Sequence, residues 1–431
     1  MERVLAAELS AHVGERVRMA GWLHHQRQLA QVAFLLLRDR SGIAQMVLTE
    51  RESRDTIAEL LGESVVEVEG SVVANEQAPG GVELVDPAVD VLTTPAEAPP
   101  FELRRPKLNA QLPTLLDHAA VSLRHPARRA LAQIAAASAS GFRDVLGRAG
   151  FTEIFTPKVV ASATESGANV FPIDWFGRSA YLAQSPQFYK QIMVGVLERV
   201  YEVGPVFRAE PHDTVRHLAE YLSLDAEMGF IRDHHDVMGV LRDVLAAMVD
   251  SIADQVQPAL RVLHLHLPEV PTEIPVVRFD DAQRMIEAST GRAIIGEPDL
   301  APADERWLGE WAQAEHGSDF VFITGYPMAK RPFYTHPDPT NPVASNSFDL
   351  LFRGLELVTG GQRLHRYQDY LDVLRGEDLA AFEGYLEAFR HGMPTHGGFA
   401  IGLERWVARL AGASNVRDVT LFPRDIHRLT P

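Results

Sequence analysis

Short runs of alternating apolar and polar residues fill the first quarter of the chain and predict β-strands. In residues 64–74, for example, valine alternates with glutamate, which is the period of a half-buried strand. The predicted strands cover residues 16–23, 33–39, 43–48, 64–74 and 82–92. A helix is expected over 51–61, between the third strand and the fourth. Five strands with one helix in this place indicate a small Greek-key barrel of the OB type, which often binds oligonucleotides.

A stretch rich in proline separates this region from the rest of the chain. Five of the 27 prolines lie between residues 93 and 114, which predicts a semi-extended linker. Beyond it a helix is expected to begin near Pro126 and to end near Gly150, because proline suits a first helical turn and glycine the position after a last one. Its apolar stripe comprises Leu131, Ile134, Ser138, Phe142, Val145 and Leu146.

The second half of the chain mixes strands and helices without a regular βαβ rhythm. It contains no GxGxxG after a predicted strand and no GxxxxGK[ST], which argues against a Rossmann or P-loop nucleotide site. An antiparallel sheet with helices packed on it fits this order better, so we expect an α+β protein.

Composition narrows the class of protein. Of the 431 residues, 46% are hydrophobic and 23% charged, as in ordinary globular chains. The absence of cysteine excludes disulfides, thiolate metal sites and cysteine nucleophiles. There is no apolar run of about 18 residues and no apolar signal core after Met1, so we expect no membrane span and a cytosolic location.

The net charge of −17 argues against a nucleic-acid partner if it is taken alone, because the mean field repels phosphate. Binding depends on local patches that release counterions, however, and two basic clusters flank the linker. They span residues 104–107 and 124–129. Each is either solvated surface or part of a groove for a polyanion.

Ionic residues of both signs share one face of a predicted hairpin. Arg208 and Glu210 precede a polar loop, and a strand over 216–227 follows it. On that strand Asp225 and other polar residues alternate with apolar ones, so the polar set points one way. Arginine can donate two hydrogen bonds to a phosphate, which favours a binding site over plain solvent exposure.

Two carboxylates are predicted to meet on a second hairpin. Arg353-Gly354 suggests a two-residue turn, which would place Asp349 and Glu356 on the same face, directly opposite or diagonal. Such a pair repels unless a cation lies between its members, and Mg²⁺ binds carboxylates together with substrate phosphates. A salt-bridged surface pair is the alternative.

A glycine-rich strand over 397–402 runs into a predicted helix that carries Arg405 in its first turn. Glycine allows close approach of a ligand to the backbone, and the helix dipole favours an anion there. Alone the motif is weak, because glycines often only permit packing.

A lysine and an arginine lie among amide side chains. The chain has only four lysines, and Lys190 stands in the tract Gln184-Ser185-Pro186-Gln187-Phe188-Tyr189-Lys190-Gln191, while Arg363 follows Gly360-Gly361-Gln362. This set suits a small anion such as a carboxylate, although an exposed loop lysine is the alternative.

Together and in this order, the motifs resemble those of class II aminoacyl-tRNA synthetases. Residues 397–406 resemble motif 3, residues 207–210 motif 2, and residues 150–157 motif 1, which forms the dimer interface of that class. Residues 184–191, 216–217 and 360–365 resemble the aspartyl-tRNA synthetase family in particular. The similarity covers nearly the whole chain, and the lack of a large inserted domain points to the archaeal-type form.

The resemblance implies a fold and three domains. We expect an N-terminal OB-fold β-barrel that binds the anticodon, followed by a class II catalytic domain with an antiparallel sheet flanked by helices. The barrel would span residues 1–93, a hinge 94–120 and the catalytic domain 121–431. A homodimer is expected from motif 1.

The resemblance also implies an ATP site. Arg208 would hold the α-phosphate and the substrate carboxylate, Glu210 would contact the adenine side, and Arg405 would contact the γ-phosphate. The implied ATP-binding residues are Arg208, Glu210, Arg216, His217, Leu218, Tyr221, Glu356, Glu404 and Arg405. Asp349, Glu356 and Thr359 match magnesium positions, with threonine where the family usually has serine.

Aspartate is the implied amino acid. Gln187, Lys190 and Arg363 match the residues that read its side chain, and Asp225 would face its ammonium group. Glu165 lies in a loop that closes over the amino acid. The implied aspartate-binding residues are Glu165, Ser185, Gln187, Lys190, Arg208, Asp225, Thr359 and Arg363.

Barrel residues bear on the choice of tRNA. Strict enzymes of this type have Trp and Lys where this chain has His24 and Pro79, so the chain resembles the relaxed type, which charges both tRNA(Asp) and tRNA(Asn). His24 as an exposed strand residue and Pro79 as a plain turn former are the alternatives. Phe34 is a candidate for stacking on an anticodon base.

The sequence also bears on the alternatives to a strict or relaxed aspartate enzyme. An asparaginyl-tRNA synthetase should lack Lys190, and a regulatory relative with a dead site should have lost Arg208, Glu356 or Arg405. A synthetase that forms asparagine from free aspartate would have little use for the N-terminal barrel. The chain retains all four residues and the barrel pattern.

Overall fold

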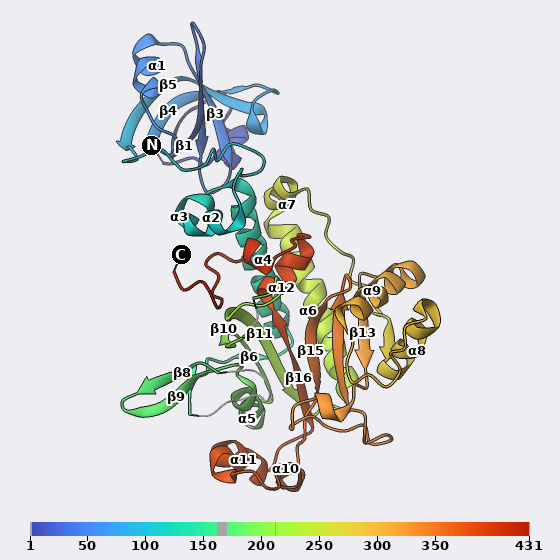
Figure 1. Ribbon diagram of the computed structural model, residues 1–431. Coiled ribbons are helices and arrows are strands. Elements are labelled where there is room, and N and C mark those ends of the chain that lie inside the picture. The colour runs from blue at the N-terminus through green and yellow to red at the C-terminus, as the bar shows by residue number, and fades with distance from the viewer. Residues whose placement is uncertain (1, 162–169, 212, 431) are drawn as a thin grey trace. The chain divides into compact units, whose positions relative to one another are not determined.

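The computed structural model describes residues 2–161, 170–211 and 213–430 of the chain. The chain divides into two compact units, residues 1–126 and 127–431 (Figure 1). None of the described helices combines the length and the apolar character that a membrane span requires.

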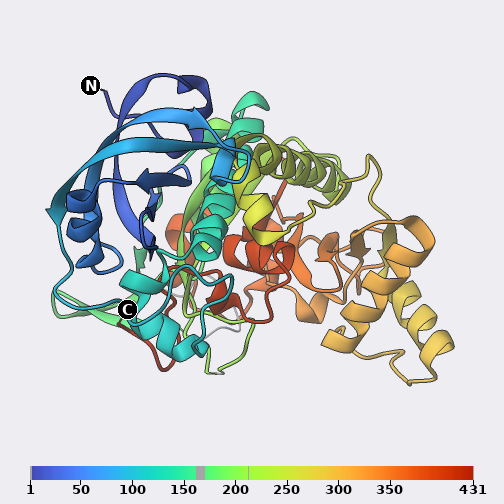
Figure 2. The ribbon, with the colours of Figure 1, turned by 90° about the horizontal axis from the view of Figure 1, so that it is seen from above.

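The first unit is a closed five-stranded barrel (blue in Figures 1 and 2), as predicted. Its strands are β1 (Arg16–Gln28), β2 (Ala33–Arg38), β3 (Ile43–Leu48), β4 (Val65–Ala74) and β5 (Val82–Thr93), in the order β1-β2-β3-β5-β4. Helix α1 (Arg51–Ala58) connects β3 to β4, also as predicted, and the shorter helices are η1 (Ala6–His12), η2 (Pro79–Gly81), α2 (Leu112–Asp117) and α3 (Ala119–Ser122). The alternating pattern explains the closure, because Leu35, Leu37, Val66 and Val68 all point into one dry core.

An eight-stranded sheet forms the centre of the second unit, in the order β12-β13-β14-β15-β16-β11-β10-β6. Its strands are β6 (Thr152–Glu153), β10 (Arg199–Phe207), β11 (Glu220–Gly229), β12 (Val276–Arg278), β13 (Phe320–Thr324), β14 (Ser347–Phe352), β15 (Glu356–Gln362) and β16 (His396–Gly402). The six central strands are antiparallel, as expected, whereas the short edge strands β12 and β6 run parallel to their neighbours. A separate three-stranded sheet has the order β7 (Val159–Val160), β9 (Arg178–Leu182), β8 (Pro172–Trp175).

Helices from distant parts of the sequence accompany this sheet, and several of them contact its strands. They are α4 (Pro126–Arg148), α5 (Gln187–Leu197), α6 (His234–Gln255), α7 (Gln257–Leu263), α8 (Phe279–Thr290), α9 (Pro302–His316), α10 (Tyr367–Val373), α11 (Glu383–Arg390) and α12 (Leu403–Leu410), with the short turns η3 (Met328–Lys330), η4 (Leu379–Phe382) and η5 (Val416–Asp418). Helices α8 and α9 (yellow to orange in Figure 2) share an apolar cluster with β13.

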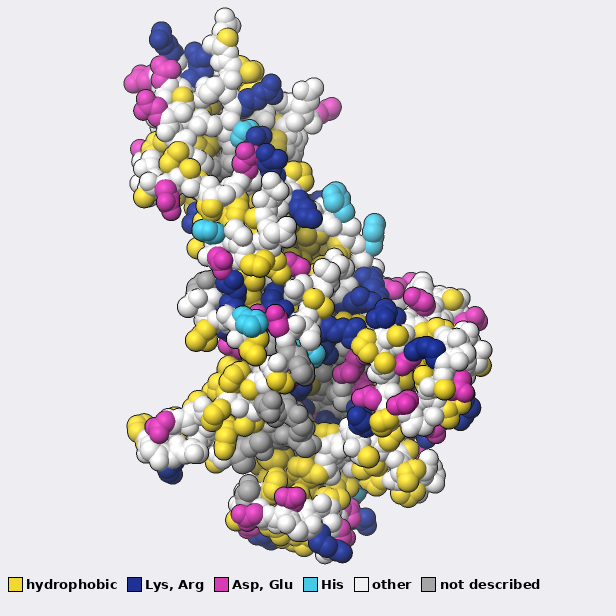
Figure 3. Space-filling model, viewed as in Figure 1, with side chains coloured by type: hydrophobic (Ala, Val, Ile, Leu, Met, Phe, Trp, Pro, Cys, Tyr) yellow, Lys and Arg dark blue, Asp and Glu magenta, His cyan; other side chains and the backbone are white. Residues whose placement is uncertain are grey.

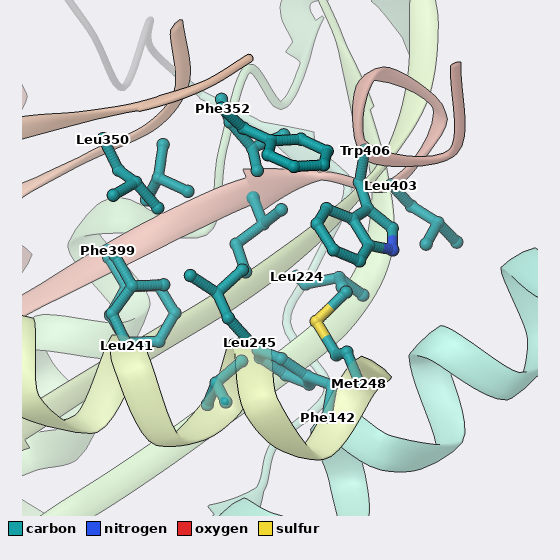
Figure 4. Close-up of a cluster of buried hydrophobic side chains, with 14 of the residues drawn as sticks. Phe142, Leu224, Leu241, Leu245, Met248, Leu350, Phe352, Phe399, Leu403 and Trp406 are labelled. Atoms are coloured by element: carbon teal, nitrogen blue, oxygen red, sulfur yellow. The ribbon is translucent and has the colours of Figure 1, made fainter. Parts of the chain in front are cut away.

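The main core lies between the central strands and helices α4, α6 and α12. Phe142 of α4, Met248 of α6 and Trp406 of α12 point toward one another beside Leu224 of β11 and Phe352 of β14 (Figure 4). All five side chains are buried, so this face of the sheet is closed to solvent. Polar residues of β11 and β15 are therefore left to the opposite face.

The hairpin of β14 and β15 has the predicted two-residue turn. Arg353 and Gly354 both have positive φ angles, 49° and 72°, as a tight hairpin turn of this kind requires. A β-bulge follows, so Asp349 pairs directly with Thr359 and lies diagonal to Glu356. The carboxylates thus share a face in the diagonal one of the two predicted arrangements.

Candidate active site

A cavity of about 320 Å³ opens on the polar face of the large sheet. It gathers side chains from α5, β11, β15, β16 and the loop after β10, which lie far apart in the sequence. The predicted site residues that line it are Ser185, Gln187, Lys190, Arg208, Glu210, Arg216, His217, Leu218, Tyr221, Asp225, Glu356, Thr359, Arg363, Glu404 and Arg405. Asp349 is buried next to Thr359 without lining the cavity, and Glu165 lies outside the described residues.

Two cations and two carboxylates form one end of the cavity. Lys190 Nζ lies 3.0 Å from Asp225 Oδ1 and 3.3 Å from Glu227 Oε2, and Arg363 Nε lies 2.9 Å from Glu227 Oε1. All four side chains are buried. Burial alone would raise the pKa of Glu227, but the charges of Arg363 and Lys190 hold it below its ordinary value. The charges balance, and both cations are held rigidly where an anionic ligand could reach them.

Glycine on β16 makes this arrangement possible. A Cβ atom on Gly398 would clash with the backbone oxygen of Ala226 and with the carboxylate of Glu227. The absence of a side chain therefore lets β16 lie against β11, and Arg363 Nη2 donates to the Gly398 carbonyl at 3.1 Å. The glycine-rich motif found in the sequence thus has a packing role directly at the site.

Arginines surround the other end of the cavity. Arg208, in the loop after β10, lies over the ring of Tyr221 at 5.8 Å, and Arg405, in the first turn of α12, donates to the Glu356 carbonyl at 3.1 Å. His217 Nδ1 is 2.6 Å from Thr214 Oγ1, and burial lowers the pKa of this histidine. A neutral histidine and two guanidinium groups suit an elongated anion.

Glu404 is the acidic residue with the largest pKa shift on the cavity wall. Burial raises its pKa to about 7, and the backbone N–H of Leu222 donates to both carboxylate oxygens at 3.1 Å. Glu404 is therefore half protonated near neutral pH, unlike an ordinary glutamate.

The carboxylate hairpin lies beside the arginine end. Thr359 Oγ1 donates to Glu356 Oε1 at 3.2 Å, and burial raises the pKa of Asp349 to about 6. Arg331 Nη2 lies 3.0 Å from Asp349 Oδ1, yet the geometry is not that of a hydrogen bond, and within the described chain this buried oxygen accepts none. Asp349, Glu356 and Thr359 bring two carboxylates and a hydroxyl together, which is a donor set that fits Mg²⁺.

Some residues at the site were not predicted from the sequence. Glu227 lies on the period-2 polar face that the sequence predicts for this strand, but it does not line the cavity and no site role was predicted for it. Arg331 follows the short turn η3 in an irregular loop, where no periodicity marks a functional side chain. Tyr334, whose ring lies 5.5 Å from Arg363 Cζ, belongs to the same loop.

In the barrel, His24 is half-buried rather than exposed. It occupies the extra position of a β-bulge in β1, and Arg38 Nη1 lies 3.5 Å from its Nδ1. Burial, helped by Arg38, lowers the pKa of His24 to about 4. Pro79 opens the turn η2 and is exposed, and Phe34 lies on the outward face of β2.

The basic clusters around the linker are partly neutralised within the first unit. Arg105 Nε lies 2.7 Å from Glu102, and Arg124 Nη1 lies 3.0 Å from the buried Glu63. The molecular surface in Figure 3 likewise shows acidic and basic side chains interspersed. The excess negative charge is thus not segregated from the basic residues on this face.

An OB-type barrel followed by a mainly antiparallel sheet, with arginines before β11 and on α12 facing one cavity, defines a class II aminoacyl-tRNA synthetase. Residues 111–426 match the family described as tRNA synthetases class II (D, K and N), and the chain belongs to this family. Residues 17–92 match the OB-fold nucleic acid binding domain.

Relatives cover the whole chain. It is 48% identical to an aspartate–tRNA(Asp/Asn) ligase of Thermus thermophilus, over 100% of both chains. It is 46% identical to the enzyme of the same name from Deinococcus radiodurans, over 100% of this chain and 99% of the other. Among solved structures it is similar to asparaginyl-tRNA synthetase from Pyrococcus horikoshii complexed with asparaginyl-adenylate, with a TM-score of 0.92, 31% identity and full coverage of both chains.

Proposed function

We propose that this chain is an aspartate–tRNA ligase that charges both tRNA(Asp) and tRNA(Asn). The observation that carries the proposal is a single cavity with Lys190 and Arg363 at one end and Arg208 and Arg405 at the other. An acidic amino acid and a triphosphate both fit this distribution of charge. Two aspartate–tRNA(Asp/Asn) ligases that are nearly half identical over the full length support it.

The reaction needs no protein nucleophile. The α-carboxylate of aspartate attacks the α-phosphorus of ATP, which gives aspartyl-adenylate and releases pyrophosphate. A hydroxyl of the 3′-terminal ribose of tRNA then attacks the aspartyl carbonyl and displaces AMP. The protein accelerates both steps by holding the reactants in line and by neutralising charge.

Aspartate occupies the end of the cavity that holds the buried cations. Lys190 and Arg363 receive its side-chain carboxylate, and Asp225 faces its ammonium group. Asparagine is disfavoured because its neutral amide gains less from these two cations than a carboxylate does. Ser185, Gln187 and Thr359 line the same region, and Glu165 is proposed from the family resemblance alone.

ATP occupies the arginine end. Arg208 holds the α-phosphate between the two substrates, and Arg405, Arg216 and His217 contact the outer phosphates. Tyr221 offers its ring to the adenine, with Glu210, Leu218 and Glu404 nearby. Asp349, Glu356 and Thr359 would hold Mg²⁺, which supplies charge neutralisation to the phosphates when it is bound.

Substitution of the buried cations tests the amino-acid assignment. Lys190→Ala or Arg363→Ala should reduce aspartate-dependent ATP–pyrophosphate exchange at least about 100-fold in kcat/KM, because each removes one of the cations that pair with a buried carboxylate and with it a ligand of the substrate. Lys107→Ala, at an exposed position in the linker, is the matched control and should leave the rate unchanged. Equal rates in all three variants would refute the assignment.

The range of tRNAs is tested by charging purified tRNA(Asp) and tRNA(Asn) with labelled aspartate. His24 and Pro79, in place of Trp and Lys, favour comparable charging of both. Charging of tRNA(Asp) alone would indicate a strict aspartate enzyme, and activation of asparagine instead of aspartate would indicate an asparagine enzyme. Lys190 disfavours the latter.

The assembly and compartment belong to the same proposal. The resemblance of residues 150–157 to motif 1 supports a homodimer, which light scattering coupled to gel filtration would detect. The proposed tRNA substrates support a cytoplasmic location, where translation takes place.

A further inference from the structure

A layer of polar side chains lies buried beneath the aspartate end of the cavity. It consists of Gln191 from α5, Tyr370 from α10, Tyr385 from α11 and His396 from β16, and each is at most 4% exposed. Gln187 joins this layer to the cavity, because it lines the cavity and its Nε2 donates to Gln191 Oε1 at 2.9 Å. None of these four residues lines the cavity.

A backbone carbonyl fixes the tautomer of His396. Its Nδ1 lies 2.9 Å from the Pro394 oxygen, and since a carbonyl can only accept, Nδ1 carries the proton. Burial lowers the pKa of this histidine to about 4, so the ring is neutral and Nε2 is an acceptor. The Gln191 atom 2.9 Å from Nε2 must therefore be the amide nitrogen.

The orientation of Gln191 in turn fixes that of Gln187. Gln191 Oε1 lies 3.0 Å from the Tyr385 hydroxyl. Because an amide oxygen can only accept, the Gln187 atom that contacts Gln191 Oε1 at 2.9 Å must be the donating amide nitrogen. The hydroxyls of Tyr385 and Tyr370 lie 2.8 Å apart, and Tyr370 donates to the Leu364 carbonyl at 3.0 Å. An unbroken chain of hydrogen bonds thus runs from the Pro394 carbonyl through His396 and Gln191 to the Gln187 amide.

We propose that Gln191 and His396 are positioning residues that hold the Gln187 amide with its nitrogen inward and its Oε1 toward the cavity. Among the described residues Oε1 accepts no hydrogen bond, and an acceptor at this place suits the ammonium group of the amino acid better than its side-chain carboxylate. A flipped amide would present N–H groups to that ammonium and repel it. The inference rests on the proposed function, since it concerns the substrate of that same site.

The test separates hydrogen bonding from packing at position 396. His396→Leu removes the acceptor, whereas His396→Gln can restore it through its own Oε1. In ATP–pyrophosphate exchange, His396→Leu and Gln191→Met should raise KM for aspartate about tenfold, the effect of one lost hydrogen bond to a charged group, with kcat and KM for ATP within about twofold. His396→Gln should stay within about threefold of the native KM.

Ser138→Ala is the matched control. It removes the buried hydrogen bond from Trp406 Nε1 to Ser138 Oγ, 3.0 Å, on the opposite face of the sheet, and should leave KM for aspartate unchanged. Should His396→Leu fail to fold, Gln191→Met and Tyr385→Phe carry the test. An unchanged KM in Gln191→Met, or an equal rise for His396→Leu and His396→Gln, would overturn the proposal. Absence of aspartate-dependent exchange in the native enzyme would instead refute the proposed function.

Discussion

At the scale of single residues, the site depends on charges that are paired before any substrate arrives. Lys190 and Arg363 are each held by Glu227, and Lys190 also by Asp225, at 2.9 to 3.3 Å. Such fixed ions need little reorganisation when an anion binds, which is the condition for strong electrostatic stabilisation. The cost is a dependence of the fold on Glu227, a buried carboxylate that does not line the cavity.

Glu227→Gln tests this dependence. The substitution leaves one buried cation unpaired, so the melting temperature should fall by several degrees. Saturating aspartate should raise the melting temperature of the variant by more than that of the native protein, because the substrate supplies the missing charge. Thermal unfolding with and without aspartate measures both effects. Glu202→Gln is the control, since Glu202 is equally buried and lies 2.8 Å from Lys158 outside the cavity. An equal response of both variants to aspartate would contradict the interpretation.

Glu404 gives the protein a predicted pH dependence. Its pKa is raised from 4.5 to about 7 by burial, with a further contribution from Glu220. The folded state keeps the proton up to about pH 7 while the unfolded state releases it near pH 4.5, so this contribution to stability is full below pH 4.5 and is lost as the pH rises to 7. Glu404→Gln cannot ionise and should escape the loss.

The expected difference can be measured by urea denaturation from pH 5 to pH 8. The denaturation midpoints of Glu404→Gln and the native protein should nearly coincide at pH 5, diverge in favour of the variant up to pH 7, and then differ by a constant amount. A difference that does not change across this range would show that Glu404 ionises normally in the folded protein.

At the scale of elements, the period of apolar residues predicted the barrel strands and helix α4 well, because each of them buries a regular face. The turn at Arg353-Gly354 was also predicted, but the bulge after it was not, since an extra residue in one strand leaves no mark in a two-residue period. The cavity itself joins residues such as Lys190 and Arg363 across 173 positions, and only the resemblance to a family brought them together. Neither the apolar period nor the family resemblance identified Arg331.

Gly398→Ala is the prediction that belongs to this scale. The new methyl group must displace β11 or the Glu227 carboxylate, so we expect a loss of stability of about 1–3 kcal/mol and at least a tenfold higher KM for aspartate. Gly147→Ala in α4 is the control, because nothing lies within 4 Å of its Cβ position, and it should be neutral or stabilising by up to about 1 kcal/mol. Denaturant unfolding and ATP–pyrophosphate exchange provide the two measurements. A native KM in Gly398→Ala would show that the strands separate without moving Glu227.

At the scale of the whole molecule, the proposed work is divided between two units. The barrel closes around a core of its own, and the described residues that line the cavity all belong to the second unit. In the proposed reaction the activation step involves no tRNA, whereas the proposed choice between two tRNAs rests on His24 and Pro79 of the barrel. The two functions should therefore respond separately to mutation.

The double substitution His24→Trp and Pro79→Lys tests this separation. Charging of tRNA(Asn) should fall at least about tenfold relative to tRNA(Asp), while ATP–pyrophosphate exchange without tRNA stays at the native rate, because both residues belong to the barrel and neither lines the cavity. His24 is half-buried beside Arg38, so the larger Trp ring is expected to destabilise the barrel to some extent. The variant His24→Phe with native Pro79 is the control for the size of the side chain. Equal losses on both tRNAs in the double variant would mean that these positions support the barrel and do not discriminate.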